Sequence, residues 1–240
     1  MPPNCPMMTH WISRLTDLLA PRPCAVCGRR LTPEESTLCM DCLLRLPFTN
    51  FEHTPFDNAM ARLFWGQLPM EKAAALFYHT PHSPAAQVIY DLKYHSRPQY
   101  GRQLGVLTGR RFLPTGFFDG MDAIVAVPLA PARQRERGYN QSDAIVEGLC
   151  RATGLPSLAR AVVRTGFTAS QTQQQSRQER MENVEGAFRL RRPDHVAGRH
   201  LLLVDDVVTT GATMLAVGKA LQEAGNVKFS LLSLGFTQPL

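Results

Sequence analysis

Residues 201–213 read LLLVDDVVTTGAT, and this stretch decides the fold of the chain. An apolar run of the length of a buried strand ends in two neighbouring acids, Asp205 and Asp206. A small, hydroxyl-rich turn follows and leads into a helical pattern. Open α/β sheets bind their ligands at the carboxyl ends of the strands. The segment therefore predicts a ligand site at one edge of such a sheet.

The turn at residues 209–213 has the properties of a phosphate-binding loop. Backbone N–H groups and the helix dipole favour an anion at a helix N-terminus, three threonines add hydroxyl donors, and the glycine allows close approach of the backbone. The two acids instead suit the neighbouring hydroxyls of a ribose, or Mg²⁺. No Gly-Lys-Ser/Thr follows, so the loop is not a Walker P-loop. Together these features predict a ribose 5-phosphate pocket, the alternative being a solvated acidic turn.

The same segment resembles the motif with which type I phosphoribosyltransferases bind 5-phosphoribosyl 1-pyrophosphate (PRPP). In that family the two acids contact the ribose 2- and 3-hydroxyls, which gives them a catalytic role, and the loop holds the 5-phosphate. The resemblance implies that PRPP contacts Asp205, Asp206, Val207, Val208, Thr209, Thr210, Gly211, Ala212 and Thr213.

Composition limits the class of protein. A chain of 240 residues with 44% hydrophobic residues can form one domain with a real core and a small module. The net charge of +6 fits a polyanionic ligand or nucleic acid, or simply a solvated basic surface. The chain lacks an apolar run long enough to span a membrane. Charged residues interrupt residues 1–19, which predict an amphipathic helix rather than a signal peptide, so we expect a cytoplasmic protein.

Four cysteines predict a zinc ribbon at residues 20–47. They form two Cys-x-x-Cys pairs, Cys24 with Cys27 and Cys39 with Cys42. Two such pairs supply four thiolates for a tetrahedral structural Zn²⁺ site, which leaves no open position for catalysis. Reduced thiols, disulfides or an iron site are the alternatives, and a reducing cytoplasm disfavours disulfides.

The remainder of the chain predicts a linker at residues 48–72 and a larger domain at 73–240. Strands are expected at 73–78, 122–127, 160–165, 201–207 and 227–236, and helices at 84–95, 98–112, 140–153 and from the phosphate loop to about 224. Strands that alternate with helices predict a mostly parallel sheet flanked by helices.

Cations begin where the strand at 122–127 ends. Residues 127–129 read Val-Pro-Leu, and Arg133 and Arg137 follow closely. Arginine can hold a pyrophosphate group in a bidentate way, whereas the alternative is a solvated basic loop. In type I phosphoribosyltransferases the loop in this position holds pyrophosphate. The resemblance therefore implies PRPP contacts from Pro128, Leu129, Arg133 and Arg137.

Two further cationic segments are candidates for the site. Residues 164–188 form a long polar stretch, and related enzymes carry there a flexible loop that closes over PRPP. By that resemblance Arg177 and Arg180 would reach the diphosphate and assist catalysis, the alternative being a disordered, solvated loop. Lys93 either points at the ligand or lies on a solvated helical face.

The order of these motifs resembles the ComF family of phosphoribosyltransferase-like proteins over roughly residues 20–237. The four-cysteine ribbon comes first, then LeuLysTyr at 92–94, ArgGlyTyrAsnGln at 137–141, the polar loop and the PRPP motif. The resemblance implies a type I phosphoribosyltransferase fold with an N-terminal zinc ribbon. It also implies PRPP with Mg²⁺ as ligand, and a role in natural transformation and DNA uptake.

Two functions are consistent with the sequence. In the first, the protein transfers the phosphoribosyl group of PRPP to an unknown acceptor and releases pyrophosphate. In the second, it is a catalytically silent PRPP-sensing module that binds single-stranded DNA or transformation proteins. Tyr139 is the main candidate for base stacking among the arginines. The sequence identifies no general base and no acceptor pocket.

Overall fold

The computed structural model describes residues 22–81, 83–94, 97–165 and 186–238. The chain divides into two compact units, Met1–Leu46 and Pro47–Leu240. The helix expected at residues 1–19 and the arginines Arg177 and Arg180 lie outside the described residues. Among the helices that are described, none has both the length and the apolar character needed to cross a bilayer.

The first unit is a short turn-rich segment built around Glu35. The Glu35 carboxylate accepts hydrogen bonds from the backbone N–H groups of Thr32 at 2.9 Å and Met40 at 2.7 Å. The second of these bonds anchors the first turn of α2 (Met40–Leu44). Arg29 pairs with Glu35 at 3.3 Å and with Asp41 at 2.7 Å. These local contacts hold the two cysteine-bearing turns of the unit.

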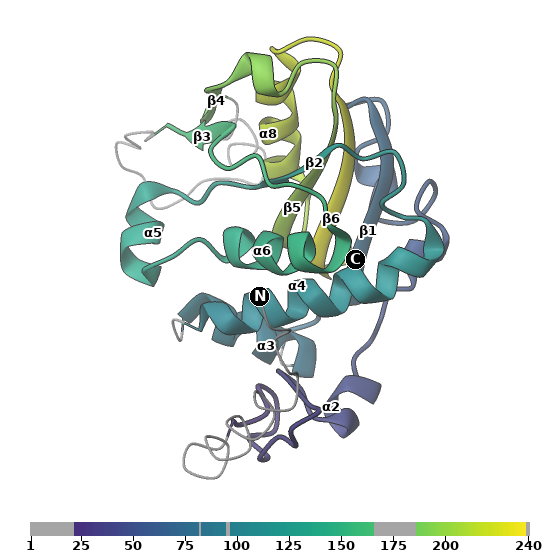
Figure 1. The fold of residues 1–240 in the computed structure, drawn as a ribbon, viewed down its shortest axis with the longest axis vertical. Helices are drawn as coiled ribbons and strands as arrows, with labels where there is room; N and C mark the ends of the chain where they lie inside the picture. Colours follow the sequence, from purple (N-terminus) through teal and green to yellow (C-terminus); the bar gives the residue numbers. More distant parts are fainter. Residues whose placement is uncertain (1–21, 82, 95–96, 166–185, 239–240) are drawn as a thin grey trace, which may run out of the picture. The chain divides into compact units, whose positions relative to one another are not determined.

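The second unit contains the predicted parallel sheet (Figure 1). Its strands are β1 (Met70–Tyr78), β2 (Ala123–Ala126), β5 (His200–Val208) and β6 (Lys228–Phe236). Their order is β1-β6-β5-β2, and every neighbouring pair is parallel. Residues on both faces of β5 and β6 are buried, which explains why these strands read as continuous apolar runs.

The main helices match the sequence prediction closely. They are α3 (Pro84–Tyr94), α4 (Pro98–Phe112), α6 (Gln141–Thr153) and α8 (Ala212–Gln222). In Figure 1, α6, α4 and α3 lie one below another beside the sheet. Helix α6 packs on β2 and β5. Helix α8 packs on β5 and on two short strands, β3 (Val162–Arg164) and β4 (Phe188–Leu190). Short 3-10 turns lie at Phe51–His53, Ala61–Leu63, Leu113–Thr115 and Pro193–His195.

Among the elements that the sequence did not predict are α5 and β4. Helix α5 (Pro131–Arg137) is short and polar, and β4 (Phe188–Leu190) has only three residues, so neither produces a clear hydrophobic period. Strand β4 pairs antiparallel with β3 (Val162–Arg164) in a separate two-stranded sheet. The strand expected at residues 160–165 therefore exists, but it does not join the parallel sheet.

Helices α4 and α6 approach closely because glycines line their contact. A Cβ atom at Gly105 would lie 2.2 Å from the Ile145 carbonyl oxygen, and one at Gly148 would lie 2.0 Å from the Arg102 carbonyl oxygen. Any larger side chain at either position would collide with the backbone of the facing helix. This contact sets the position of α6, whose first turn contributes to the site.

The segment expected as a linker belongs to the second unit and contains a buried ion pair. The Arg111 Nε atom of α4 lies 2.7 Å from a Glu52 carboxylate oxygen, and the Glu52 side chain is only 1% exposed. Arg111 also donates to Asn50 at 2.6 Å and lies over the Phe48 ring. These contacts hold residues 48–53 against α4.

Candidate functional site

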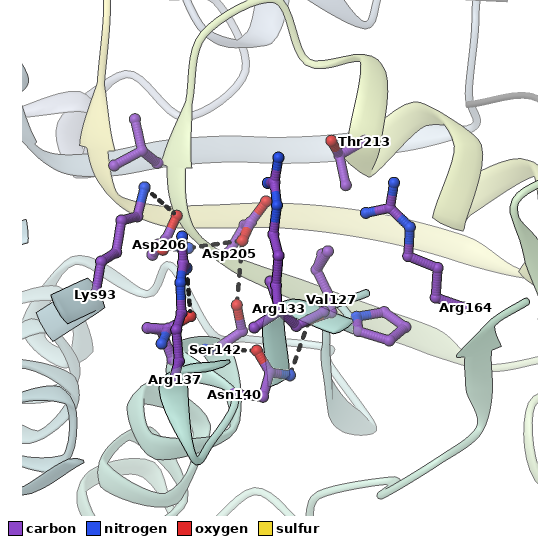
Figure 2. Close-up of a pocket in the computed structure, with 14 residues that line it drawn as sticks. Lys93, Val127, Arg133, Arg137, Asn140, Ser142, Arg164, Asp205, Asp206 and Thr213 are labelled. Atoms are coloured by element: carbon purple, nitrogen blue, oxygen red, sulfur yellow. Dashed lines mark hydrogen bonds and ion pairs between the residues drawn. The ribbon is translucent and has the colours of Figure 1, made fainter. Parts of the chain in front are cut away.

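A cavity of about 170 Å³ opens at the carboxyl ends of β2 and β5 (Figure 2). Side chains from α3, α5 and the first turn of α6 complete its walls. Nine of the predicted ligand contacts line it: Lys93, Pro128, Leu129, Arg133, Arg137, Asp205, Asp206, Val207 and Thr213. The structure thus brings together residues from four separate segments of the chain at the sheet edge that the sequence indicated.

The acid pair forms one wall of the cavity. Asp206 is buried, with 9% of its surface exposed, and its backbone N–H donates to Asp205 Oδ1 at 2.8 Å. Asp205 keeps some surface toward the cavity, while its carboxyl lies deep within the protein. This burial, together with the neighbouring Asp206 charge, raises the pKa of Asp205 to about 7. Asp205 is therefore partly protonated near neutral pH.

Hydrogen bonds from the start of α6 hold Asp205 in place. The Ser142 hydroxyl donates to Asp205 Oδ1 at 3.1 Å, and the Ser142 N–H donates to the Asn140 side chain at 3.3 Å. Asn140 is the N-cap of α6, and its amide also donates to the Val127 carbonyl at 3.1 Å. The helix cap consequently joins the end of β2 to the acid at the end of β5.

Lys93 faces the acids rather than solvent. Its Nζ atom lies 3.3 Å from Asp206 Oδ1, and its side chain is 24% exposed. The Tyr139 hydroxyl donates to the carbonyl of Leu92, the residue before Lys93. Burial raises the pKa of Tyr139 to about 12, so this donor stays protonated. Tyr139, expected as a stacking surface, is partly buried and instead fixes the end of α3 that carries Lys93.

Three arginines also line the cavity. Arg133 and Arg137 project from α5, and Arg164 projects from the end of β3 (Figure 2). Burial and the nearby Arg133 charge lower the pKa of Arg164, and the Asp205 charge opposes them. Next to Arg164, a second cavity of about 330 Å³ is also lined by Arg160 and Arg191. The β2 side of the site is therefore suited to a polyanion.

The predicted phosphate loop lines a small adjoining cavity of about 40 Å³. Gly211 is the N-cap of α8 and has a φ of +77°, a value that favours glycine. A Cβ atom there would also lie 2.7 Å from Phe64 Cζ. The remaining predicted loop contacts line this cavity: Val208, Thr209, Thr210, Gly211 and Ala212. Thr213 lines both cavities. The loop backbone thus leads into a helix N-terminus beside the acids, where a phosphate is favoured.

The site includes residues that the sequence analysis did not assign to it. Ser142 was given no role at the site, Asn140 appeared within the ArgGlyTyrAsnGln motif, and Arg164 appeared only as the start of a polar segment. Each stands at the end of a strand or the start of a helix, a position that could have indicated the site edge. Arg177 and Arg180 lie outside the described residues.

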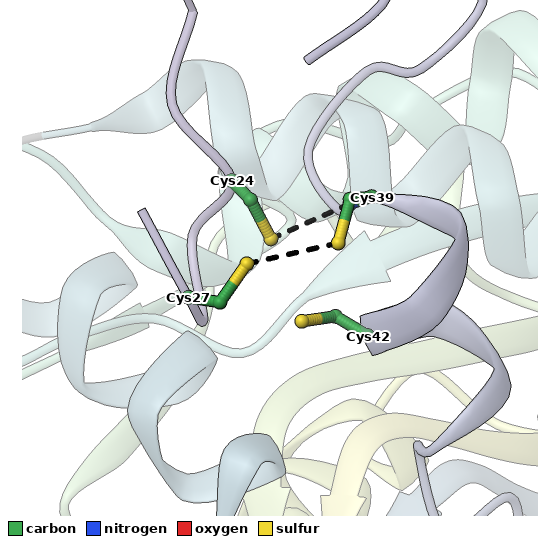
Figure 3. A group of neighbouring side chains, drawn as sticks. All are labelled: Cys24, Cys27, Cys39 and Cys42. Carbon is green, nitrogen blue, oxygen red and sulfur yellow. Dashed lines mark hydrogen bonds between the residues drawn. The ribbon is translucent and has the colours of Figure 1, made fainter. Parts of the chain in front are cut away.

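The four cysteines of the first unit converge (Figure 3). Their sulfur atoms all lie within 4.8 Å of one another, and Cys27 Sγ lies 3.7 Å from Cys39 Sγ. Sulfurs bound tetrahedrally to Zn²⁺ at about 2.3 Å lie about 3.8 Å apart, so the cluster fits such an ion. The Cys39 N–H donates to Cys24 Sγ at 3.3 Å, which favours a thiolate. Among the described cysteines none forms a disulfide.

Comparison with known proteins agrees with this geometry. The family profile described as "Phosphoribosyl transferase domain" matches residues 146–232, which include β5, the phosphate loop and α8. The fold and the acid pair followed by this loop define a protein with a type I phosphoribosyltransferase fold, as the sequence predicted.

Related proteins identify the family more narrowly than the domain profile does. DNA utilization protein YhgH of Escherichia coli (strain K12) is 34% identical over 205 residues, which cover 84% of this chain and 85% of that protein. Competence protein F of Haemophilus influenzae is 38% identical over 43% of this chain and 45% of its own, and Competence protein ComFC of Streptococcus pneumoniae is 36% identical over 46% of each. The chain belongs to the ComF family of phosphoribosyltransferase-like proteins.

The solved structure of glutamine PRPP amidotransferase from B. subtilis is 20% identical to this chain. The match covers 60% of this chain and 30% of that one, with a TM-score of 0.38.

Proposed function

We propose that the protein binds Mg²⁺-PRPP in the cavity of Figure 2 and transfers its phosphoribosyl group to an acceptor. One observation carries this proposal: an acid pair, a phosphate loop and an arginine group line two adjoining cavities that share Asp205, Val207 and Thr213. These three surfaces match the ribose hydroxyls, the 5-phosphate and the pyrophosphate of one ligand. The names of the relatives support a role in DNA utilization and competence. We propose that this role is in natural transformation, in the cytoplasm.

Each part of the site has a distinct task in this reaction. Asp205 and Asp206 orient the ribose through its hydroxyls, and the backbone of residues 209–213 holds the 5-phosphate. Arg133 and Arg137 stabilise the negative charge that collects on the departing pyrophosphate. The ribose carbon becomes cationic as the C–O bond breaks, so catalysis rests on positioning and electrostatics. Arg177 and Arg180 are proposed to join the pyrophosphate contacts.

The proposed function includes two metal sites. The carboxylates of Asp205 and Asp206 are hard oxygen ligands, which suit Mg²⁺ shared with phosphate oxygens of PRPP. When bound, that ion neutralises part of the diphosphate charge. The four-cysteine cluster is proposed to hold Zn²⁺ in a closed structural site that stabilises the first unit.

Calorimetric titration with Mg²⁺-PRPP tests the binding site. The full chain is expected to bind, and a variant with Asp205→Ala and Asp206→Ala is expected to show no heat of binding. Asp194→Ala is the matched control, since Asp194 is an exposed acid on a 3-10 turn away from the cavity lining. Unchanged affinity in the double variant would refute the assigned site. Radiolabelled PRPP incubated with candidate acceptors then measures transfer.

A second function is a silent PRPP-sensing module that binds single-stranded DNA. The observation that favours it is an exposed aromatic pair on α3: the rings of Tyr90 and Tyr94 are 4.8 Å apart, and the residues are 51% and 54% exposed. The Arg137 guanidinium lies over Tyr94 at 5.4 Å. Aromatic faces beside cations are typical of surfaces that stack successive bases.

Fluorescence anisotropy with a labelled oligonucleotide at low salt separates the two functions. Binding that weakens in a Tyr90→Ala, Tyr94→Ala variant and falls steeply with added salt would support the DNA-binding module. Phosphoribosyl transfer to any acceptor would instead exclude a catalytically silent protein.

A further inference from the structure

One part of the sheet edge beside the cavity has no role in the proposed function. Strand order at the ligand edge is β1-β6-β5-β2, with the acid pair on β5 and the arginines beyond β2. The residues that follow β1 and β6 on the other side are His79 and Thr237. They occupy the same edge of the sheet, since Tyr78 is in register with Phe236 and Phe236 with Val208.

The stereochemistry of transfer predicts that the acceptor approaches from the part of the sheet edge formed by β6 and β1. If pyrophosphate leaves toward Arg133 and Arg137, it covers the face of the ribose carbon that points to β2. An acceptor must then arrive at the opposite face, which points toward β6 and β1. The acceptor also has to lose a proton as its new bond forms, so a proton-accepting group is expected on that side.

His79 is held at this position by the backbone and by Thr237. Its N–H donates to the Phe236 carbonyl at 2.8 Å, and its Nδ1 atom lies 3.3 Å from Thr237 Oγ1. Gly235 on β6 separates it from the cavity: a Cβ atom there would lie 3.2 Å from His79 Cβ and 3.1 Å from Cγ2 of Val207, which lines the cavity. A methyl group at Gly235 would press on both side chains, so the glycine allows His79 to lie close to Val207.

The surroundings of His79 favour its neutral imidazole. Burial and the Lys93 ammonium on α3 lower the pKa of His79, and the Asp206 carboxylate on β5 opposes them. If Nδ1–H donates to Thr237, the lone pair of Nε2 is available to accept a proton. A neutral imidazole at pH 7 is the form that a general base requires.

We propose that His79 is the proton acceptor of the transfer reaction and that Thr237 is its positioning residue, so that the acceptor reacts through an N–H or O–H group. This rests on the proposed function. An acceptor lone pair bonds to the ribose carbon while the bond to the pyrophosphate oxygen breaks. The electron pair leaves on pyrophosphate, and the acceptor proton passes to His79 Nε2.

Histidine NMR on the full chain tests the location without knowledge of the acceptor. The ring signal of His79, assigned with His79→Asn, is titrated with pH in the absence and presence of saturating Mg²⁺-PRPP. The bound phosphates add negative charge nearby, so PRPP is expected to raise the pKa of His79, whereas exposed His195 should not respond. An unchanged His79 titration while calorimetry shows bound PRPP would overturn this proposal alone. Absence of PRPP binding would instead refute the proposed function.

The role is tested with water as the acceptor, by measuring pyrophosphate release from Mg²⁺-PRPP. His79→Asn keeps an amide that can pair with Thr237 but has no base. We expect its release rate to fall on the order of 10²-fold, with unchanged PRPP affinity and no acid limb in the pH profile. His195→Asn is the matched control. Thr237→Val keeps the imidazole and should reduce the rate less. An undiminished rate in His79→Asn, or an acid limb that persists, would refute the base assignment.

Discussion

The glycine contact between α4 and α6 predicts that replacing Gly105 with alanine destabilises the protein, although alanine has the higher helix propensity. Gly105→Ala places a methyl group 2.2 Å from the Ile145 carbonyl oxygen and 3.0 Å from both Gly148 Cα and the Leu149 nitrogen. All three are backbone atoms, which cannot rotate away. A carbon–oxygen contact is normally about 3.3 Å or longer. The two helices must therefore separate by about 1 Å.

The magnitude follows from two opposing effects. Alanine favours an isolated helix over glycine by about 1 kcal/mol. Overpacking of a tight contact costs about 1–3 kcal/mol, and a collision with rigid backbone lies at the upper end of that range. We therefore expect Gly105→Ala to lower the free energy of unfolding by about 2 kcal/mol. Because α6 carries Ser142, which bonds to Asp205, affinity for Mg²⁺-PRPP should fall as well.

Urea unfolding followed by far-UV circular dichroism measures the change. Gly218→Ala in α8 is the matched control, because its new methyl would meet only the ends of the flexible Leu68 side chain, at 2.7 and 2.8 Å. That variant should remain within about 1 kcal/mol of the wild type. The reasoning would be refuted if Gly105→Ala were as stable as the wild type, or if Gly218→Ala were the more damaging change.

Three further predictions concern other parts of the chain. Because the folded Asp205 carboxyl has a pKa of about 7, it keeps a proton that the unfolded chain loses near pH 4, so stability should decrease as pH rises from about 4 to 7. Urea midpoints at pH 5 and pH 8 should differ less in Asp205→Asn; equal differences would contradict this. Cys39→Ser should lose zinc in atomic absorption while α/β circular dichroism persists, and full zinc stoichiometry would disprove it. Arg111→Ala leaves Glu52 buried without its cation and should cost about 3–5 kcal/mol in denaturant unfolding. The pair Arg111→Met with Glu52→Gln should recover much of that loss, and a neutral single variant would contradict the account.

The sequence alone determined the local elements with strong patterns. The apolar run before Asp205 and Asp206 could only be a buried strand, and the small residues after it could only be a turn into a helix. The spacing of the four cysteines likewise predicted their convergence, because two short knuckles bring ligands together with little help from the rest of the chain. Signals of this kind depend on neighbours in sequence, so they need no knowledge of the fold.

The tertiary structure decided which distant side chains meet. Ser142 contacts Asp205, and Lys93 contacts Asp206, only because parallel strands with helical crossovers bring separate segments to one sheet edge. His79 reaches that edge because β6 lies between β1 and β5, an order that no local pattern encodes. Strand order and helix contact are cooperative properties of the packed core, and for that reason the contacts of Ser142 and Lys93 with the acid pair became visible only in the folded chain.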